Sequence, residues 1–504
     1  MDWMKLKSGS DVRGKAVGDG AAITDRVSMA LGMAFVLFLA EKEHKPAASI
    51  RIALGRDSRI TGEELLRAAE EGILRAGGSA VDFGLCTTPA MFMALVTPEL
   101  PLDGTIMITA SHHPWDRNGL KFFTKDGGIE SEDVETLLRS AKDLHPEESE
   151  ISGDSEKYDF LPVYSDLLAD RIRQGLETKG DRPLSGLHAV VDAGNGAGGF
   201  YAKLLADLGA DTAGSQFLEP DGMFPNHIPN PENQEAIESL RSAVVRSGAD
   251  IGVIFDTDCD RAAVVDADGR EINRNRLIAL ISGILLKNRP GQTIVTDSVT
   301  SSGLKIYIEE RGGTHYRYRR GYRNVINEAV RLNKAGIPCP LAIETSGHAA
   351  LQENYFLDDG MYLVTLLIVQ AMKMKKEGHT LGSLIEDLRE PVESSEIRLN
   401  ILEPDFRTCG ENVIQSLLAY ASKDDAWHVA PDNREGVRIS FDLNGVPDSG
   451  WFLLRLSVHD PVLPLNCESD TAGGVREMLN RMYQAVKDVP GVDWTPILQA
   501  AGEN

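Results

Sequence analysis

Short runs of apolar and β-branched residues recur along the chain, and three of them end at an aspartate, at residues 52–57, 189–192 and 293–297. Each leads into a helix-like stretch that closes at glycine, and a second strand-like run such as residues 80–83 follows. Strand, helix, glycine and strand in this order predict a βαβ unit and therefore parallel sheet. Three such units predict one α/β domain repeated three times, and one large sheet is the less favoured alternative at this length.

The pattern changes near residue 391. Residues 394–402 alternate between apolar and polar, residues 412–423 are helix-like, residues 436–441 and 450–457 predict a hairpin, and residues 475–487 predict a closing helix. This combination is typical of an antiparallel α+β layer. We therefore expect an α/β protein with a C-terminal α+β domain, divided at 1–163, 164–271, 272–390 and 391–504.

Composition indicates a folded protein and disfavours nucleic acids and membranes as partners. The chain has 504 residues, of which 42% are hydrophobic and 25% charged, and its net charge is −24. So acidic a protein is a poor candidate for nucleic-acid binding, which needs a basic face. The most apolar run, residues 28–40, is shorter than the roughly 20 residues that span a bilayer. Five cysteines without a C-x-x-C pair exclude a disulfide framework and fit a reducing compartment, so we expect a cytoplasmic protein without membrane partners.

A serine is the first candidate for chemistry. Thr-Ala-Ser-His-His-Pro at 109–114 follows the strand-like residues 104–108. A serine on a tight turn at the end of a strand is exposed and can act as a nucleophile. The alternative for Ser111 is an ordinary turn stopped by Pro114. No G-x-S-x-G surrounds the serine, which disfavours the nucleophile elbow of esterases.

Three carboxylates follow the buried-strand pattern of residues 251–255. Asp256, Asp258 and Asp260 alternate, and in an extended chain alternate side chains share a face, so the carboxylates converge. A few hard oxygen ligands favour Mg²⁺ completed by phosphate or water. An EF-hand is excluded because its sixth and twelfth positions are Arg261 and Ala267. A solvated acidic loop is the alternative.

Gly194, Gly196 and Gly199 match G-x-G-x-x-G directly after a predicted strand. The pattern permits a dinucleotide site, with Asp211 as a possible ribose ligand. Asp192 at the end of the strand would repel a pyrophosphate, however. We interpret the glycines as a tight strand-to-helix turn.

Two further segments suit a phosphorylated sugar. Glu-Thr-Ser-Gly-His at 344–348 offers a carboxylate and a hydroxyl for sugar hydroxyls, and His348 could carry protons near neutral pH. Arg455 and Ser457, together with the arginines of residues 317–323, suggest an anion pocket in an acidic shell. The alternatives are a satisfied loop histidine and a solvated basic face.

These segments, in this order, resemble the α-D-phosphohexomutase superfamily, most closely its phosphomannomutase/phosphoglucomutase branch. The resemblance extends from residues 9–14 to the Arg455 loop. It implies three related mixed-sheet α/β domains and a fourth α+β domain around a central cleft. The loop 455–461 departs from the family pattern, because Val458 and His459 replace a small or polar residue and a threonine, and His113 replaces the usual asparagine.

The resemblance also implies residue roles. Ser111 would carry phosphate and, with Asp256, Asp258 and Asp260, would hold Mg²⁺. Arg13, Lys121, Arg261 and His348 match positions around the reacting phosphate, with Lys121 and His348 as general acid/base candidates. The residues expected to bind substrate are Glu344, Ser346, Arg319, Tyr322, Arg323, Arg455, Ser457 and His459.

The implied reaction exchanges hexose 1-phosphate and hexose 6-phosphate of glucose or mannose. It would proceed through a phosphoserine and a hexose 1,6-bisphosphate, which would also serve as activator. A phosphoglucosamine mutase, a metal-dependent sugar-phosphate phosphatase and a non-catalytic sugar-phosphate sensor remain as alternatives. The sequence makes no prediction about oligomeric state.

Overall fold

A computed structural model describes residues 2–457 and 460–502, with Asn288 described by its backbone alone. The chain forms two compact units. The first contains Met1–Leu277 and Ser346–Leu384, and the second contains Ile278–Thr345 and Ile385–Asn504.

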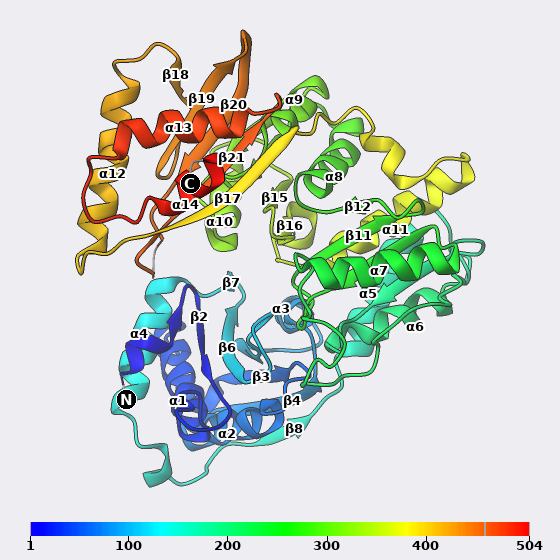
Figure 1. Ribbon diagram of the computed structural model, residues 1–504. Coiled ribbons are helices and arrows are strands. Elements are labelled where there is room, and N and C mark those ends of the chain that lie inside the picture. The colour runs from blue at the N-terminus through cyan, green and yellow to red at the C-terminus, as the bar shows by residue number, and fades with distance from the viewer. Residues whose placement is uncertain (1, 458–459, 503–504) are drawn as a thin grey trace. The chain divides into compact units, whose positions relative to one another are not determined.

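The N-terminal part of the first unit is built on a mixed sheet with strand order β1-β2-β6-β5-β3-β4-β8, and β7 pairs with β6 (Figure 1). Its strands are β1 (Lys7–Ser8), β2 (Asp11–Lys15), β3 (Arg51–Arg56), β4 (Ser79–Leu85), β5 (Gly104–Ile108), β6 (Arg117–Thr124), β7 (Gly127–Gly128) and β8 (Ser155–Lys157). The helices are α1 (Asp25–Lys42), α2 (Gly62–Arg75), α3 (Thr88–Val96) and α4 (Ser131–Asp143). Strands β3 and β4 are parallel and joined by α2, so the first predicted βαβ unit is confirmed.

The apolar run 28–40 forms most of α1, a helix whose side chains are largely buried. Helices α1 and α2 pack closely because both carry glycine at their contact. A Cβ on Gly32 would collide with the carbonyl oxygen of Ala69, and one on Gly72 would collide with that of Met29. Among the residues that the structure describes, no helix combines the length and apolar character required to span a bilayer.

A second mixed sheet follows in the first unit, with order β12-β11-β10-β9. Its strands are β9 (Ala189–Asp192), β10 (Ile251–Phe255), β11 (Ala262–Asp266) and β12 (Glu271–Ile272), and its helices are α5 (Leu161–Gly175), α6 (Phe200–Asp207), α7 (Gln234–Ser247) and α11 (Gly360–Lys376). Strands β9 and β10 are parallel. The predicted strand after Gly209 is wrong, because only single bridges, His188 to Asp211 and Asp192 to Gln216, replace it.

The second unit begins with α8 (Arg274–Asn288), which crosses from the first unit, and continues with an α/β layer. The elements of this layer are β13 (Thr293–Thr296), α9 (Ser302–Glu310), β14 (Thr314–Arg317), α10 (Tyr322–Lys334) and β15 (Leu341–Ile343). Strand β13 pairs in parallel with both β14 and β15, so the third βαβ unit is also confirmed. The chain then returns to the first unit, where β16 (Ala349–Leu351) precedes α11.

The C-terminal layer is an antiparallel sheet with order β17-β21-β20-β19-β18. Its elements are β17 (Glu393–Asn400), α12 (Phe406–Ala421), β18 (Trp427–Val429), β19 (Val437–Leu443), β20 (Val446–Leu454), β21 (Val462–Ser469), α13 (Gly474–Val486) and α14 (Thr495–Ala501). The predicted hairpin is β19–β20, which turns at Asn444 and Gly445, both with positive φ, as Asn-Gly hairpins favour. Helix α13 was predicted to be the last helix, and this is wrong, because α14 follows it.

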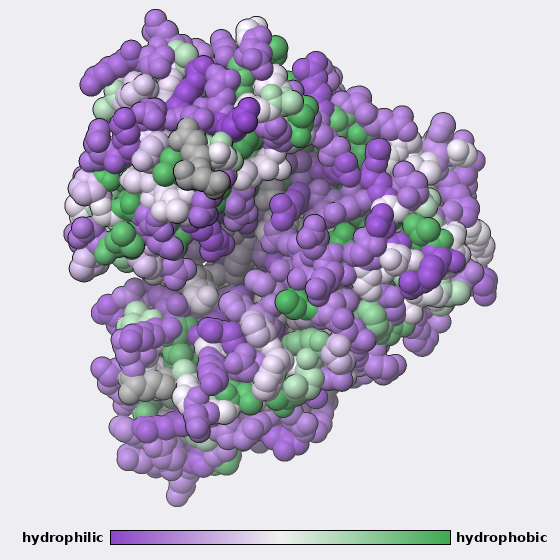
Figure 2. All heavy atoms as spheres, viewed as in Figure 1, coloured by the Kyte–Doolittle hydropathy of each residue, from purple (hydrophilic) through white to green (hydrophobic). Residues whose placement is uncertain are grey.

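The predicted fold class, three mixed-sheet α/β domains and a C-terminal α+β domain, is confirmed. The four domain boundaries and the central cleft stay predictions. The face drawn in Figure 2 is mainly hydrophilic, with apolar residues in small scattered groups. All five cysteines are buried free thiols.

Candidate active site

The serine loop begins where β5 ends. Ser111 has a φ of 52° and its backbone N–H donates to Oγ1 of Thr109 at 2.8 Å, so the turn is tight, as predicted. The expected exposure is wrong, however, because Ser111 is only 2% exposed. Residues from the loop after β10 lie against its hydroxyl.

The aspartate loop 256–261 connects β10 to β11 and reverses the chain. The N–H of Cys259 donates to the carbonyl of Asp256 at 3.2 Å, and Cys259 has a φ of 66°. The three aspartates therefore converge through a turn and not, as predicted, through an extended strand. One carboxylate oxygen from each of Asp256, Asp258 and Asp260 lies within 4.8 Å of the others.

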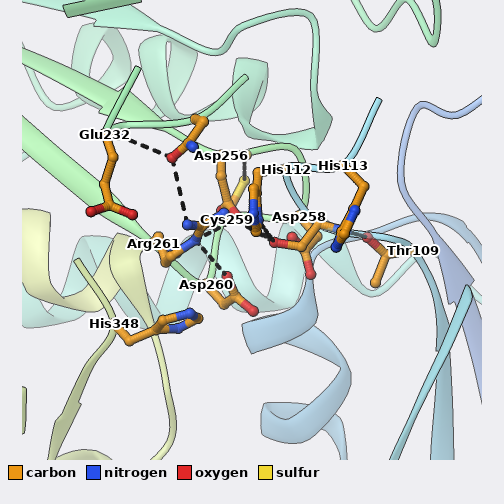
Figure 3. A network of polar contacts seen from close by, with 12 residues as sticks. Thr109, His112, His113, Glu232, Asp256, Asp258, Cys259, Asp260, Arg261 and His348 are labelled. Carbon is orange, nitrogen blue, oxygen red and sulfur yellow. Dashed lines mark hydrogen bonds and ion pairs between the residues drawn. The ribbon is translucent and has the colours of Figure 1, made fainter. Parts of the chain in front are cut away.

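The serine and aspartate loops meet directly (Figure 3). The Ser111 hydroxyl donates to Oδ2 of Asp256 at 2.8 Å, and Nη2 of Arg261 donates to the Ser111 oxygen at 3.2 Å. The same guanidinium binds Asp256 through Nε and Nη2, each at 3.1 Å. A hydroxyl, a carboxylate and a guanidinium are thus in mutual contact.

Lys121 is the second cation at the cluster. It lies on β6, is 4% exposed, and its Nζ contacts Oδ2 of Asp258 at 2.8 Å and the carboxylate of Asp260. Burial alone would lower the pKa of Lys121, but the two aspartates outweigh it and raise the pKa well above its ordinary value. Lys121 is therefore held in its charged form.

The aspartates of the cluster differ in pKa. Burial alone would raise the pKa of Asp260, but Lys121 and other neighbouring cations outweigh it and hold that pKa below its ordinary value. Burial, with Asp260 and Asp258 nearby, raises the pKa of Asp256 to about 8. In addition, Oδ1 of Asp258 and Oδ1 of Asp260 are buried and make no hydrogen bond in the described part of the chain. Unpartnered carboxylate oxygens in a buried acidic cluster fit a hard divalent cation. The cluster is an acidic metal-binding site in its donor chemistry.

His348 reaches the same cluster from the loop after β15. Figure 3 shows its ring directed toward Asp260, and Nδ1 contacts the carboxylate of Asp358. Burial alone would lower the pKa of His348, but Asp358 and Asp260 outweigh it and raise the pKa to about 9. Asp358 was not among the residues predicted for the site. The available signal was the Asp-Asp pair that precedes α11, whose second member, Asp359, caps that helix.

Arg13 lies on β2, opposite Gly119 on β6, and pairs with Asp11 at 2.6 Å. Burial, together with Arg261 and other cations including Arg13, lowers the pKa of His112 to about 2. The pKa of His113 falls to about 4 through burial and the charge of Arg13. Both histidines of the serine loop are therefore neutral near pH 7, and the positive charge beside Ser111 comes from arginine and lysine.

The glycine motif forms the predicted strand-to-helix turn. Asp192 accepts from the N–H of Gly194 at 2.9 Å and from the side chain of Gln216 at 2.7 Å, and lies 3.1 Å from Nε2 of His227. Gly196 lies against the aspartate loop, since a Cβ there would be 2.7 Å from the carbonyl oxygen of Thr257. The glycine turn therefore packs directly against the backbone of the aspartate loop at Thr257.

The second unit contains another polar group of residues. Oε1 of Glu344 accepts from the N–H of Gly321 at 2.6 Å, next to Tyr322 and Arg323 at the start of α10. Nε of Arg319 donates to the carbonyl of Arg434 at 3.2 Å. Of the predicted sugar-loop residues, Ser346 belongs to the first unit, and Glu344 to the second.

Arg455 is the candidate anion ligand of this group. Burial and the neighbouring Arg320 lower its pKa, and its buried Nε has no hydrogen-bond partner in the part of the chain that is described. Ser457 follows at the end of the same segment, and its Oγ accepts from the N–H of Asp460 at 3.2 Å. His459 lies outside the described residues. Arg317, one of the arginines of residues 317–323, pairs with Asp432 at 2.7 Å. Nearby in the sequence of the C-terminal layer, the guanidinium of Arg438 stacks on the ring of Trp451.

Comparisons with known proteins show which family the chain belongs to. The models for alpha/beta/alpha domains I, II and III of phosphoglucomutase/phosphomannomutase match residues 4–144, 163–269 and 273–392. A phosphoglucomutase of Neisseria gonorrhoeae is 31% identical over 486 residues, covering 96% of this chain and 97% of that protein. A phosphomannomutase/phosphoglucomutase of Pseudomonas syringae is 30% identical, covering 88% of each chain.

A solved structure of a phosphoglucomutase/phosphomannomutase family protein from Burkholderia thailandensis aligns with a TM-score of 0.79 and 28% identity, covering 97% of this chain and 98% of that one. The three domain models together match most of the chain, and the curated relatives match it almost end to end. The chain therefore belongs to the phosphoglucomutase/phosphomannomutase family of the α-D-phosphohexomutase superfamily.

Proposed function

We propose that this hexose-phosphate mutase interconverts the 1-phosphate and 6-phosphate of glucose, mannose or both, and that Ser111 carries the transferred phosphoryl group. The observation that supports the role of Ser111 most strongly is the 2.8 Å contact between its hydroxyl and Asp256 of the acidic cluster. A serine without a phosphoryl role has no need of a buried metal-type cluster and a guanidinium at its oxygen.

Each transfer exchanges one P–O bond for another. A free hydroxyl of the sugar attacks the phosphorus of phosphoserine, its proton leaves to a base, and the bond to Ser111 breaks as the Ser111 oxygen regains a proton. The resulting 1,6-bisphosphate turns round, and the same exchange in reverse returns its other phosphoryl group to Ser111. No phosphate is released overall.

The chain's own cations stabilise this transfer. Arg261 contacts the Ser111 oxygen at 3.2 Å and so lies where the phosphoryl charge develops. Lys121 and His348 are the proposed proton carriers, and the pKa of each is raised by carboxylates of the cluster, so each is protonated near neutral pH and ready to donate. Arg13 adds positive charge beside the serine loop.

Asp256, Asp258 and Asp260 would hold Mg²⁺ together with an oxygen of phosphorylated Ser111. When bound, the ion would supply charge neutralisation for the transferring phosphoryl group. The two unpartnered oxygens of Asp258 and Asp260 support this choice of ligands. We further propose a hexose 1,6-bisphosphate as the activator that restores phosphoserine when the intermediate escapes.

Substrate recognition is assigned to polar residues outside the serine loop. Glu344 and Ser346 would bind sugar hydroxyls, and the group Arg319, Tyr322, Arg323, Arg455, Ser457 and His459 would bind the rest of the sugar phosphate. The buried Nε of Arg455 has no hydrogen-bond partner among the described residues, which supports a phosphate ligand at that position, because arginine pairs with two phosphate oxygens at once. The five free thiols fit the proposed cytoplasmic location.

The test combines intact mass with turnover. The purified enzyme should carry one phosphoryl group after treatment with glucose 1,6-bisphosphate, and it should convert glucose 1-phosphate or mannose 1-phosphate to the 6-phosphate without releasing inorganic phosphate. Stoichiometric phosphate release would indicate a phosphatase instead. Turnover confined to glucosamine phosphate would identify the phosphoglucosamine alternative, and binding by calorimetry without turnover would identify a sensor.

A further inference from the structure

Arg59 occupies an unusual position beneath the serine loop. It lies between β3 and α2, its side chain is 0% exposed, and it ranks among the largest fully buried side chains. Its Nη1 donates to the carbonyl oxygens of Pro114 at 2.7 Å and Arg117 at 2.8 Å. Its Nη2 donates to the carbonyl oxygens of His113 at 2.6 Å and Ser111. One guanidinium thus binds four carbonyls of the segment that carries the serine.

The charge of Arg59 is balanced by Asp57, which also binds the loop. Nε of Arg59 lies 3.3 Å from Oδ2 of Asp57, and the same oxygen accepts from the hydroxyl of Thr109 at 2.6 Å. Thr109 in turn accepts from the N–H of Ser111 at 2.8 Å. A buried charge is costly unless it is paired and hydrogen-bonded. Loss of either the ion pair or the loop contacts would therefore destabilise the other.

A segment from the second α/β layer of the same unit covers this arginine. The Phe224 ring lies 5.3 Å from Cζ of Arg59. Gly222 packs against the backbone of residues 58–60, since a Cβ there would be 2.5 Å from the N atom of Ile60. The cover excludes water, and hydrogen bonds in a dry site are stronger than in water.

We propose that Arg59 is the positioning residue that holds the Ser111 loop in the conformation required for phosphoryl transfer. Ser111 has a φ of 52°, a conformation that persists in a non-glycine residue only when its surroundings enforce it. Only arginine offers enough donors in one rigid plane to bind four carbonyls. The guanidinium reaches Ser111 through its backbone oxygen, so Arg59 acts on the reaction through the loop.

The test variant is Arg59→Lys, which keeps the charge and loses the fork of donors. We expect kcat to fall about 10²-fold, the effect of a small misplacement of a reacting group, with KM changed less than about threefold. Amide hydrogen exchange of residues 109–117 should accelerate in the same variant. The matched control is Arg67→Lys on the surface of α2, whose side chain is 72% exposed, and it should match the wild type in every readout.

Wild-type kcat in a folded Arg59→Lys variant, or unchanged exchange in residues 109–117, overturns the proposal. Should Arg59→Lys fail to fold, Phe224→Ala provides a second route, because removing the ring hydrates the guanidinium. Exchange of residues 109–117 should then accelerate, and unchanged exchange again contradicts the role.

This proposal depends on the proposed role of Ser111, yet the two fail separately. A wild-type enzyme that is never phosphorylated and turns over no hexose phosphate removes the proposed function, whatever the exchange data show. A phosphorylated, active wild type whose Arg59→Lys variant is equally active and equally protected removes only the role of Arg59.

Discussion

The hydroxyl of Ser111 donates a hydrogen bond of 2.8 Å to Oδ2 of Asp256, a residue 145 positions further along the chain. The contact joins the end of one sheet to the end of another. It places the hydroxyl that we propose carries the phosphoryl group at the edge of a buried acidic cluster.

Replacing Ser111 with alanine should abolish phosphoryl transfer and leave the fold intact. We expect mutase turnover to fall about 10³-fold or more, which corresponds to about 4 kcal/mol of lost transition-state stabilisation. Intact mass should show no phosphoryl group after incubation with glucose 1,6-bisphosphate. The exposed Ser185→Ala is the matched control, and normal turnover by Ser111→Ala would remove the serine from the mechanism.

Replacing Asp258 with asparagine should weaken metal binding. The change neutralises one of three converging carboxylates, including the buried Oδ1 that has no partner in the described residues. We expect the Mg²⁺ dissociation constant to rise at least about tenfold, measured by calorimetry on chelator-treated protein. Asp268→Asn, on the exposed turn after β11, should bind Mg²⁺ like the wild type. Equal affinity in both variants would show that the cluster does not bind the ion.

Replacing Arg455 with alanine should act on substrate binding rather than on the chemical step. A phosphate contact made equally in ground and transition states affects KM alone. We expect KM for glucose 1-phosphate to rise about 10- to 100-fold, the value of a charge-assisted hydrogen bond, with kcat nearly unchanged. Arg398→Ala on β17, where the side chain is 71% exposed, is the control. A lower kcat at constant KM would assign Arg455 a different role.

Replacing Gly196 with alanine should displace the backbone of the aspartate loop at Thr257. The added methyl would be 2.7 Å from the carbonyl oxygen of Thr257, between the proposed metal ligands Asp256 and Asp258. Overpacking of this kind costs about 1–3 kcal/mol of stability, and the displaced loop should also bind Mg²⁺ more weakly. In the control Gly180→Ala, the added methyl would contact Thr178 Oγ1 at 3.4 Å, an ordinary van der Waals distance. This variant should change neither the stability nor the Mg²⁺ affinity. Unchanged urea unfolding and Mg²⁺ affinity in Gly196→Ala would contradict the close approach.

The His227–Asp192 pair should make stability depend on pH. Burial alone would lower the pKa of His227, but the hydrogen bond to Asp192 and its charge raise the pKa above its ordinary value. A raised pKa in the folded state stabilises the protein fully below the unfolded pKa of about 6.5, and the benefit is lost as pH rises through the folded pKa.

His227→Gln should therefore lower the free energy of unfolding more at about pH 6 than at about pH 9, by about 1–3 kcal/mol at the lower pH. Urea unfolding of the variant and the wild type at both pH values measures the difference. His379→Gln, at an exposed position after α11, is the control. A difference between variant and wild type that is equal at both pH values would show that His227 is neutral in the folded protein.

Local sequence patterns were sufficient for the fold class, and they selected candidate residues that the structure brings together. Runs of apolar and β-branched residues located β3, β5, β10 and β13, and the turn chemistry located the serine and aspartate loops at the ends of β5 and β10. These features depend on residues close together in the chain. One of the failed predictions, a strand after Gly209, is also informative. Only isolated bridges form there, and local propensity cannot distinguish a single bridge from a paired strand.

What the sequence by itself determined was the fold class and which groups are candidates for chemistry: Ser111, the three aspartates and the cations of their loops. What only the tertiary structure decided was how those groups are held, because the supporting contacts join distant segments. The four carbonyl contacts of Arg59 extend over about 50–60 positions, and the ion pairs of Lys121 with Asp258 and Asp260 join different sheets. Burial gives such contacts their strength, and burial is a property of the packed chain rather than of any one segment.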